Sequence, residues 1–235
     1  GFAKLDQICE DVAQAVDGAE IIFVVLPAFA HAYVAQELAG CLVDGQTVVV
    51  CPGATGGALE FRAIWDRAGC RSKVRLCETN SLFYAARAQD AVATISGVKD
   101  ELSLAALPAQ DTQAIIDDLS DVYPQLIPAA NVLETSLNNM NTVVHPLPVL
   151  LNAGRIERGE KFRHYFDGIT PAVGEVVEQM DRERVAVGRA YGLDILSLRD
   201  AYIHYYHVQA EKMSDLCHMS QAHANIMAPG GLDSR

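Results

Sequence analysis

Hydrophobic residues in the first half of the chain fall in short, nearly continuous runs separated by more polar segments. The clearest runs are Glu20–Leu26, Thr47–Cys51 and Val74–Glu78, which are rich in β-branched and other apolar residues. A strand buried on both faces has this composition, whereas a strand with one face in water alternates apolar and polar positions. We therefore predict buried strands here, and two further strands over Ala91–Ile95 and Leu102–Leu107.

The segments between these runs have helical spacing instead. Helices are predicted over Leu5–Val16, Ala28–Leu42 and Gly57–Ala68. Strands that alternate with helices at this spacing are typical of a doubly wound, Rossmann-like α/β sheet, which binds ligands outside the carboxyl ends of its strands. Residues 1–131 are accordingly predicted to form part of such an α/β domain.

The hydrophobic period changes near Val132, and only helical patterns follow it, so residues 132–235 are predicted to form an all-helical domain. The most apolar stretch of this half is Leu137–Gly154, which polar residues interrupt at steps of three, four and seven. These residues are Asn138, Asn141, His145 and Asn152. One continuous helix would place all four on a single stripe.

A polar stripe on an apolar helix has two physical explanations. A buried amide or imidazole without a partner costs about 1–3 kcal/mol, so the stripe is either a satisfied network in the core or the wall of a polar cavity. Pro146 and Pro148 predict an irregular backbone at His145, because proline interrupts helical hydrogen bonding. A core histidine and a catalytic histidine both fit this pattern, and the choice stays open here.

Two longer helical patterns follow. Thr170 and Pro171 supply the N-cap and first position of one helix, which Gly192 ends. A second helix is predicted from Leu196 to about Met213. The charged run at 181–184, DRER, is interpreted as a solvated face.

The loops after the first two predicted strands carry the residues of most interest in the α/β half. LPAFAH contains Pro27, and CPGATGG contains Gly53 and Thr55. Glycines let the backbone approach a ligand at a helix N-terminus, where anions are favoured. The second loop matches neither a Walker loop nor GxGxxG, so an ordinary glycine turn is the competing interpretation.

Composition and charge narrow the classes of partner. A net charge of −12 and a pI near 4.9 disfavour binding to nucleic acid or to an anionic membrane, since both need a basic surface. No apolar run approaches the ~20 residues of a membrane span, and the six cysteines show no metal-ligand spacing. We expect reduced cysteines, no metal site, a cytoplasmic location and small-molecule partners.

Several ordered segments resemble one known family. NNMNTVVHPLPVLLNAGRIE and YFDGITPAVGEVVEQMDRERVAVGRAYGL look like the helical substrate domain of the octopine/nopaline (opine) dehydrogenases. VVLPAFAH, VVVCPGATGGALEF and ETNSLFYAAR are similar to the second half of that family's dinucleotide-binding domain. The resemblance implies a partial dinucleotide-binding domain over 1–131 and a helical substrate or dimerisation domain over 132–235.

The same resemblance implies the chemistry and the site. The reaction would be the reductive condensation of an α-keto acid, such as pyruvate, with an amino acid to a secondary amine, with NAD or NADP as cofactor. His145 would be the catalytic acid/base, with Asn141 and Asn152 lining the substrate pocket. The implied cofactor-binding residues are Pro27, Gly53 and Thr55.

The family pattern is incomplete in this chain. The GxGxxG loop would precede Gly1, and the segment with the family's catalytic aspartate, a pattern like RYxTEDVP, would follow the final GLDSR. The chain is therefore expected to be a fragment that lacks both ends of the active site.

Two alternatives remain. One is a keto-acid or hydroxy-acid reductase of the same two-domain plan, and the other is a non-catalytic remnant that acts in dimerisation or ligand binding. The residues leave open the amino acid, the keto acid, the choice between NAD and NADP, and whether the chain forms a homodimer.

Overall fold

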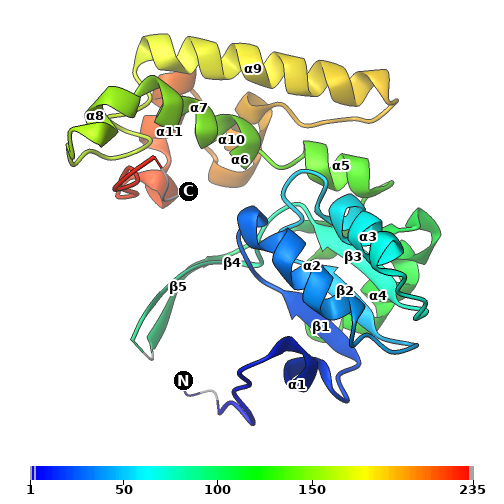
Figure 1. The fold of residues 1–235 in the computed structure, drawn as a ribbon. Helices are drawn as coiled ribbons and strands as arrows, with labels where there is room; N and C mark the ends of the chain where they lie inside the picture. The colour runs from blue at the N-terminus through cyan, green and yellow to red at the C-terminus, as the bar shows by residue number, and fades with distance from the viewer. Residues whose placement is uncertain (1, 3, 91, 233–235) are drawn as a thin grey trace. The chain divides into compact units, whose positions relative to one another are not determined.

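A computed structural model of the chain describes residues 2, 4–90 and 92–232 (Figure 1). The described residues form two compact units that divide between Ser136 and Leu137. The first unit is α/β and the second is helical, so the predicted fold class is confirmed.

The first unit is built on a five-stranded sheet in the order β1-β2-β3-β6-β7. Its strands are β1 (Ile21–Val24), β2 (Thr47–Val50), β3 (Arg75–Thr79), β6 (Leu102–Leu107) and β7 (Leu126–Pro128). β1, β2 and β3 run parallel, β6 runs antiparallel to β3, and β7 runs parallel to β6. The carboxyl ends of β1, β2 and β3 therefore meet at one edge of the sheet.

Helices cover both faces of this sheet. The elements are α1 (Val12–Val16), η1 (Ala28–Ala30), α2 (His31–Ala39), α3 (Gly57–Ala68), η2 (Ala109–Asp111), α4 (Thr112–Leu119) and α5 (Val132–Leu137). Val48 and Val50 pack with α2 and α3 on one face, whereas Val49 packs with α4 on the other. All four residues of β2 are buried, as the unbroken apolar run predicted.

A two-stranded antiparallel hairpin extends from the first unit (Figure 1). It consists of β4 (Tyr84–Gln89) and β5 (Val92–Val98). The sequence did not predict β4, and the predicted strand over Ala91–Ile95 continues to Val98. Ala91 itself lies outside the described residues.

The first predicted helix is wrong over its amino-terminal half. Helix α1 begins only after Asp11, whose Oδ1 accepts a hydrogen bond from the Gln14 amide at 2.8 Å. Leu5 and Ile8 are 69% and 83% exposed. A helix over these residues would have an apolar face without packing partners, and short helices depend on such packing. An N-cap hydrogen bond therefore sets the start of this helix.

In the part of the second unit that the structure describes, short helices surround one long helix. They are α6 (Asn141–Val144), α7 (Pro146–Leu151), α8 (Ala153–Glu157), α9 (Pro171–Ala190), α10 (Leu198–Tyr206), α11 (Met213–Met219) and η3 (Gln221–His223). Helix α9 packs against α6, α7 and α11 and shares with them an apolar core that includes Val144, Val177 and Leu216. Thr170 caps α9 as predicted, because its hydroxyl accepts from the Val173 amide.

Two helical predictions in this half need correction. Leu137–Gly154 is not one helix, because the chain breaks at His145 and again at Asn152. The helix predicted from Leu196 to Met213 ends at Tyr206, where His207 takes a left-handed conformation with φ +54°, and α11 follows separately.

The charged run DRER is not simply a solvated face. Asp181 and Arg184 are buried and form an ion pair of 2.7 Å. Arg184 also donates to the carbonyls of Leu137 and Leu196. Helical spacing of three residues places these two side chains on the same inward face, which periodic hydrophobicity alone does not reveal.

Candidate functional site

The break at His145 follows directly from the two prolines. His145 ends α6 and precedes α7 with φ −102° and ψ −63°, and Pro146 occupies the first position of α7. Pro148 has no N–H to offer the Val144 carbonyl, four residues earlier. His164 takes that place, since its Nε2 lies 2.9 Å from the Val144 oxygen. The predicted irregular backbone at His145 is confirmed, and a second histidine stabilises it.

His145 is held by a buried tyrosine. Its Nε2 lies 2.7 Å from the hydroxyl oxygen of Tyr165, which is 2% exposed. The Tyr165 ring lies against the His223 ring, with 4.3 Å between centroids, and His223 Nδ1 is 2.8 Å from the Ser220 hydroxyl. Sequence reasoning missed Tyr165, because a separation of 20 residues carries no periodic signal.

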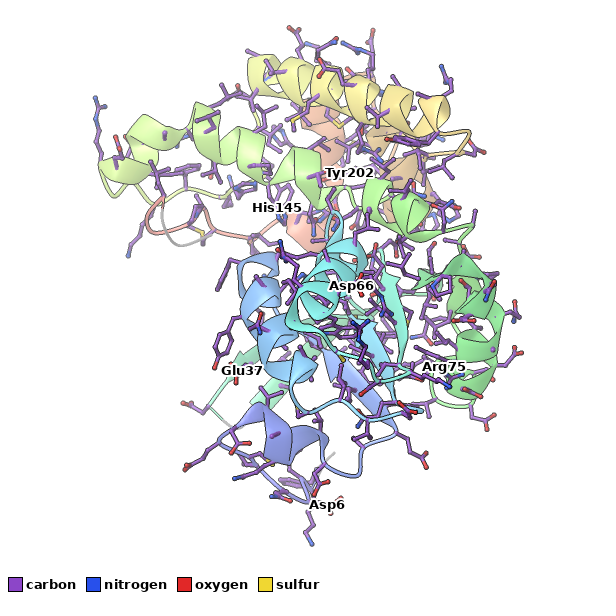
Figure 2. The ribbon with its side chains drawn as sticks, turned by 45° about the vertical axis from the view of Figure 1, so that its right-hand side comes forward. Asp6, Glu37, Asp66, Arg75, His145 and Tyr202 are labelled. Carbon is purple, nitrogen blue, oxygen red and sulfur yellow. The ribbon has the colours of Figure 1, made fainter. Side chains whose placement is uncertain are left out.

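A cavity of about 380 Å³ opens beside His145. Its walls are almost entirely apolar. The lining residues are His145, Pro146, Val149, Leu150, Ala153 and Leu232. A pocket with apolar walls and one polar, titratable group is the ordinary form of a small-molecule site. His145, which Figure 2 labels in the helical unit, is the polar group of this cavity.

The asparagines of the predicted stripe have different environments. Asn138 accepts from the Leu196 amide at 3.0 Å, and Asn141 is exposed at the start of α6. Asn152 is buried, donates to the carbonyls of Pro148 and Gly168, and accepts from Arg155 at 3.1 Å. Neither Asn141 nor Asn152 lines the cavity beside His145. Because the helix is interrupted at His145 and again at Asn152, the four residues do not form one continuous helical stripe.

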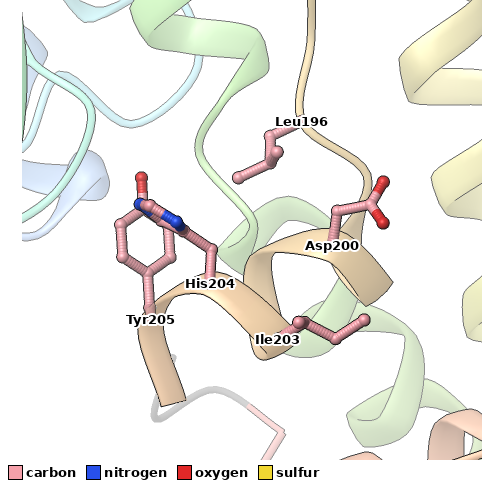
Figure 3. Close-up of a pocket in the computed structure, with 5 residues that line it drawn as sticks. All are labelled: Leu196, Asp200, Ile203, His204 and Tyr205. Atoms are coloured by element: carbon pink, nitrogen blue, oxygen red, sulfur yellow. The ribbon is translucent and has the colours of Figure 1, made fainter. Parts of the chain in front are cut away.

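A second cavity of about 330 Å³ lies along α10 (Figure 3). Its lining residues are Leu196, Asp200, Ile203, His204 and Tyr205. Asp200 already binds the Ser197 hydroxyl at the helix start, and the His204 and Tyr205 rings meet edge to face at 4.7 Å. None of the residues predicted for the site lines this cavity.

In the first unit, the predicted cofactor residues lie at the carboxyl ends of β1 and β2. Pro27 and Thr55 are exposed, whereas Gly53 is buried. The Gly53 amide donates to the Thr79 carbonyl at 2.9 Å, which ties the CPGATGG loop to the end of β3. The topology therefore brings these three residues to the same edge of the sheet, while Gly53 faces the protein interior.

Two buried titratable side chains lie under this loop. Glu78, at 0% exposure, accepts hydrogen bonds from the Ala58 amide, Thr135 and Ser136. Burial raises the pKa of the Glu78 carboxyl, and these hydrogen bonds oppose the rise. Burial also lowers the pKa of His31, whose Nε2 lies 3.3 Å from the Leu26 carbonyl oxygen. The sequence contains one indication that Glu78 is unusual, namely a carboxylate at the end of the apolar run VRLCE.

Neither a metal site nor a membrane span is formed by the described residues. Among them, no three or more His, Cys, Asp or Glu side chains are grouped to hold a metal ion. No helix in the described part of the chain is long and apolar enough to cross a membrane. All six cysteines are free thiols.

Sequence comparison identifies relatives for the whole chain. Residues 128–235 match the family model of the NAD/NADP octopine/nopaline dehydrogenase alpha-helical domain. The chain is 37% identical over 236 residues to an opine dehydrogenase of Arthrobacter sp. (strain 1C), covering 100% of this chain and 66% of that protein. It is 24% identical to the vitopine synthase of Allorhizobium ampelinum, covering 97% of this chain and 63% of that one.

Structural comparison agrees with these matches. A solved octopine dehydrogenase with NADH and L-arginine has a TM-score of 0.73 at 20% identity, covering 97% of this chain and 60% of the other. At this identity the likeness shows the fold alone. The chain spans about two thirds of the length of the two curated relatives. Taken together, the match of the helical domain and the 37% identity along the entire chain show that it belongs to the octopine/nopaline (opine) dehydrogenase family.

Proposed function

We propose that the protein is an NAD(P)H-dependent opine dehydrogenase, which condenses an α-keto acid with an amino acid and reduces the product to a secondary amine. One observation carries the proposal: His145, held by Tyr165, is the titratable group of an apolar cavity at a break between two helices. The 37% identity to an opine dehydrogenase supports the same reaction.

The residues at the carboxyl ends of β1 and β2 fit a nucleotide. Pro27 and Thr55 are exposed there, at the edge where doubly wound sheets bind dinucleotides. When bound, NAD(P)H supplies the hydride. We assign Pro27 and Thr55 to contact with the cofactor, and Gly53 to the shape of the loop, since it is buried.

His145 would move the protons of the condensation. Joining a protonated amine to a keto acid expels the keto oxygen as water, so two protons must leave the nitrogen and two must reach that oxygen. An imidazole performs both transfers near neutral pH. The hydrogen bond to Tyr165 holds the ring in one orientation, as acid–base catalysis requires.

The two asparagines predicted for substrate binding receive different assignments. Asn141 has an exposed side chain at the start of α6, and we keep it as a substrate-binding residue. The Asn152 amide is occupied on both its oxygen and its nitrogen by protein partners. We propose that Asn152 supports the pocket by joining α7 to the chain at Gly168.

The test is oxidation of NADH or NADPH by the complete protein, supplied with pyruvate and a panel of amino acids. An opine dehydrogenase oxidises the nucleotide only when keto acid and amino acid are both present, and the product is a secondary amine by mass spectrometry. Oxidation with the keto acid alone would identify a reductase of the same plan. No turnover with any pair would favour the non-catalytic alternative.

Location and assembly belong to the same proposal. Six free thiols fit a reducing compartment, and we propose the cytoplasm. Sedimentation of the complete protein distinguishes a monomer from a homodimer.

A further inference from the structure

Glu78 is the most deeply buried carboxyl group of the α/β unit, and the proposed reaction does not use it. It lies in β3 at 0% exposure, and in the described part of the chain it forms no ion pair. Burying a carboxylate that has no ion-pair partner is unfavourable unless hydrogen bonds compensate. The hydrogen bonds of Glu78 therefore indicate what this side chain does.

The side-chain hydrogen bonds of Glu78 lead to the start of α3, directly after the CPGATGG loop, and to α5. Oε2 accepts from the Ala58 amide at 2.7 Å, at the start of α3 immediately after the loop. Oε1 accepts from the hydroxyls of Thr135 at 2.6 Å and Ser136 at 3.0 Å. The Ser136 hydroxyl in turn accepts from the Gly56 amide at 2.9 Å. Glu78 thus links β3 and α5 to the carboxyl end of the CPGATGG loop, where α3 begins.

Gly53 of the loop makes room for this carboxyl group. A Cβ at Gly53 would lie 2.4 Å from Cδ and Oε2 of Glu78, a distance that real Cβ atoms essentially never show. At Gly57, by contrast, a Cβ would lie 3.6 Å from Oε2 and 3.4 Å from His31 Nδ1, which are ordinary van der Waals distances. The sequence suggested that these glycines let the backbone approach a ligand; in the structure, Gly53 lets it approach Glu78.

We propose that Glu78 is a positioning residue for the dinucleotide, acting through the loop and not by contact with the ligand. The inference rests on the proposed function, since it requires that this loop binds NAD(P)H. Hydrogen bonds to Gly56 and to Ala58, the residue after the loop, keep Thr55 in a fixed conformation at the carboxyl end of β2. Such prior ordering reduces the entropy lost on binding.

The test compares two substitutions at Glu78 in the complete protein, with fluorescence titration of NADH and NADPH. Glu78→Leu fills a similar volume without hydrogen bonds, and Glu78→Gln keeps an acceptor for Ala58 and offers donors to Thr135 and Ser136. We expect Glu78→Leu to raise the nucleotide Kd about tenfold or more, as when a hydrogen bond to a charged group is lost. Glu78→Gln should restore most of the affinity.

Glu37→Gln is the matched control, because it removes one carboxylate from the exposed surface of α2 and should leave the Kd unchanged. KM for the keto acid should stay at the wild-type value in all three variants. A folded Glu78→Leu protein with wild-type Kd would overturn the positioning role, even if its melting temperature fell. Should Glu78→Leu not fold, Ser136→Ala removes the hydroxyl that accepts from the Gly56 amide and donates to Glu78, and it is judged by the same Kd criterion.

Failure of the proposed function gives a different result. A wild-type protein that binds neither NADH nor NADPH would overturn the function and this role together. A wild-type protein that binds either nucleotide, with an unaffected Glu78→Leu variant, would overturn the positioning role alone.

Discussion

At the scale of the residue, His145 combines a break in the helical backbone with the proposed acid/base side chain. Pro146 begins α7 immediately after it, and Tyr165 holds its ring from a distant segment. General acid–base catalysis by one positioned group contributes about 10²–10⁴-fold. We expect His145→Ala to lower kcat of the condensation by about 10²-fold or more, with an unchanged Kd for NAD(P)H. A variant that kept most of its turnover and the wild-type pH profile would make His145 a core histidine.

Tyr165→Phe is the companion substitution, because it keeps the ring against His223 and removes only the hydroxyl. Loss of one hydrogen bond contributes about 0.5–1.5 kcal/mol, so kcat should fall by at most about tenfold. The measurement is kcat against pH, at saturating nucleotide. If Tyr165→Phe lowered kcat as much as His145→Ala does, we would assign the acid/base role to Tyr165 instead.

A second residue-scale prediction concerns His31, which is 1% exposed against Phe61. Burial lowers its pKa below 6.5, so the folded state holds this group neutral while the unfolded state protonates it below pH 6.5. Its contribution to stability is therefore complete above the unfolded pKa and declines as the pH falls through 6.5 toward the lowered folded value. The limiting slope is about 1.4 kcal/mol per pH unit.

The measurement compares wild-type and His31→Gln proteins by urea unfolding at pH 5 and pH 7.5. The single tryptophan, Trp65, reports on this part of the unit because its ring packs against Phe61. We expect the substitution to destabilise the protein less at pH 5 than at pH 7.5. Glu78, with its raised pKa, gives the opposite slope in a range above pH 4.5, and it acts equally in both proteins.

At the scale of the element, α9 is held by the buried pair of Asp181 and Arg184. Asp181 Oδ2 accepts from the Leu198 amide at 2.7 Å, and Arg184 donates to the carbonyls of Leu137 and Leu196. The pair thus connects α9 to Leu137 and to the chain at the start of α10. Removing one partner of the pair leaves the other charge buried and unpaired.

We expect Arg184→Met to lower the free energy of unfolding by about 3–5 kcal/mol, the range measured when one partner of a buried ion pair is removed. The double variant Asp181→Leu with Arg184→Met should be less destabilised than Arg184→Met alone, since no charge stays unpaired. Thermal unfolding followed by circular dichroism of the helices measures both. Equal losses in the single and double variants would mean that the carbonyl contacts, not the charge, dominate.

At the scale of the whole molecule, charge sets the class of partner. A net charge of −12 repels phosphate backbones, which bind proteins through Lys and Arg and release counterions. We expect no mobility shift of duplex DNA with micromolar protein at low salt, where electrostatic binding is strongest. A salt-sensitive shift would show a local basic surface strong enough to override the total charge.

The sequence by itself determined the α/β half, the helical half and the main elements that build them. Runs such as Thr47–Cys51 are apolar on both faces, and only a strand covered on both sides satisfies them. Gly57–Ala68 became a helix over the predicted residues, because local spacing and flanking glycines agree there. The irregular backbone at His145 was predictable for the same reason, since proline acts on its own segment.

Only the tertiary structure decided which residues meet. Tyr165 reaches His145 from 20 residues away, and Thr135 and Ser136 reach Glu78 from nearly 60. Helical periodicity extends over a few turns and carries no information about such pairs. For the same reason DRER looked solvated and Asn152 looked available, although partners from distant segments occupy them. The local sequence pattern shows that a buried polar group needs a hydrogen-bond partner, but only the packed fold decides which residue that partner is.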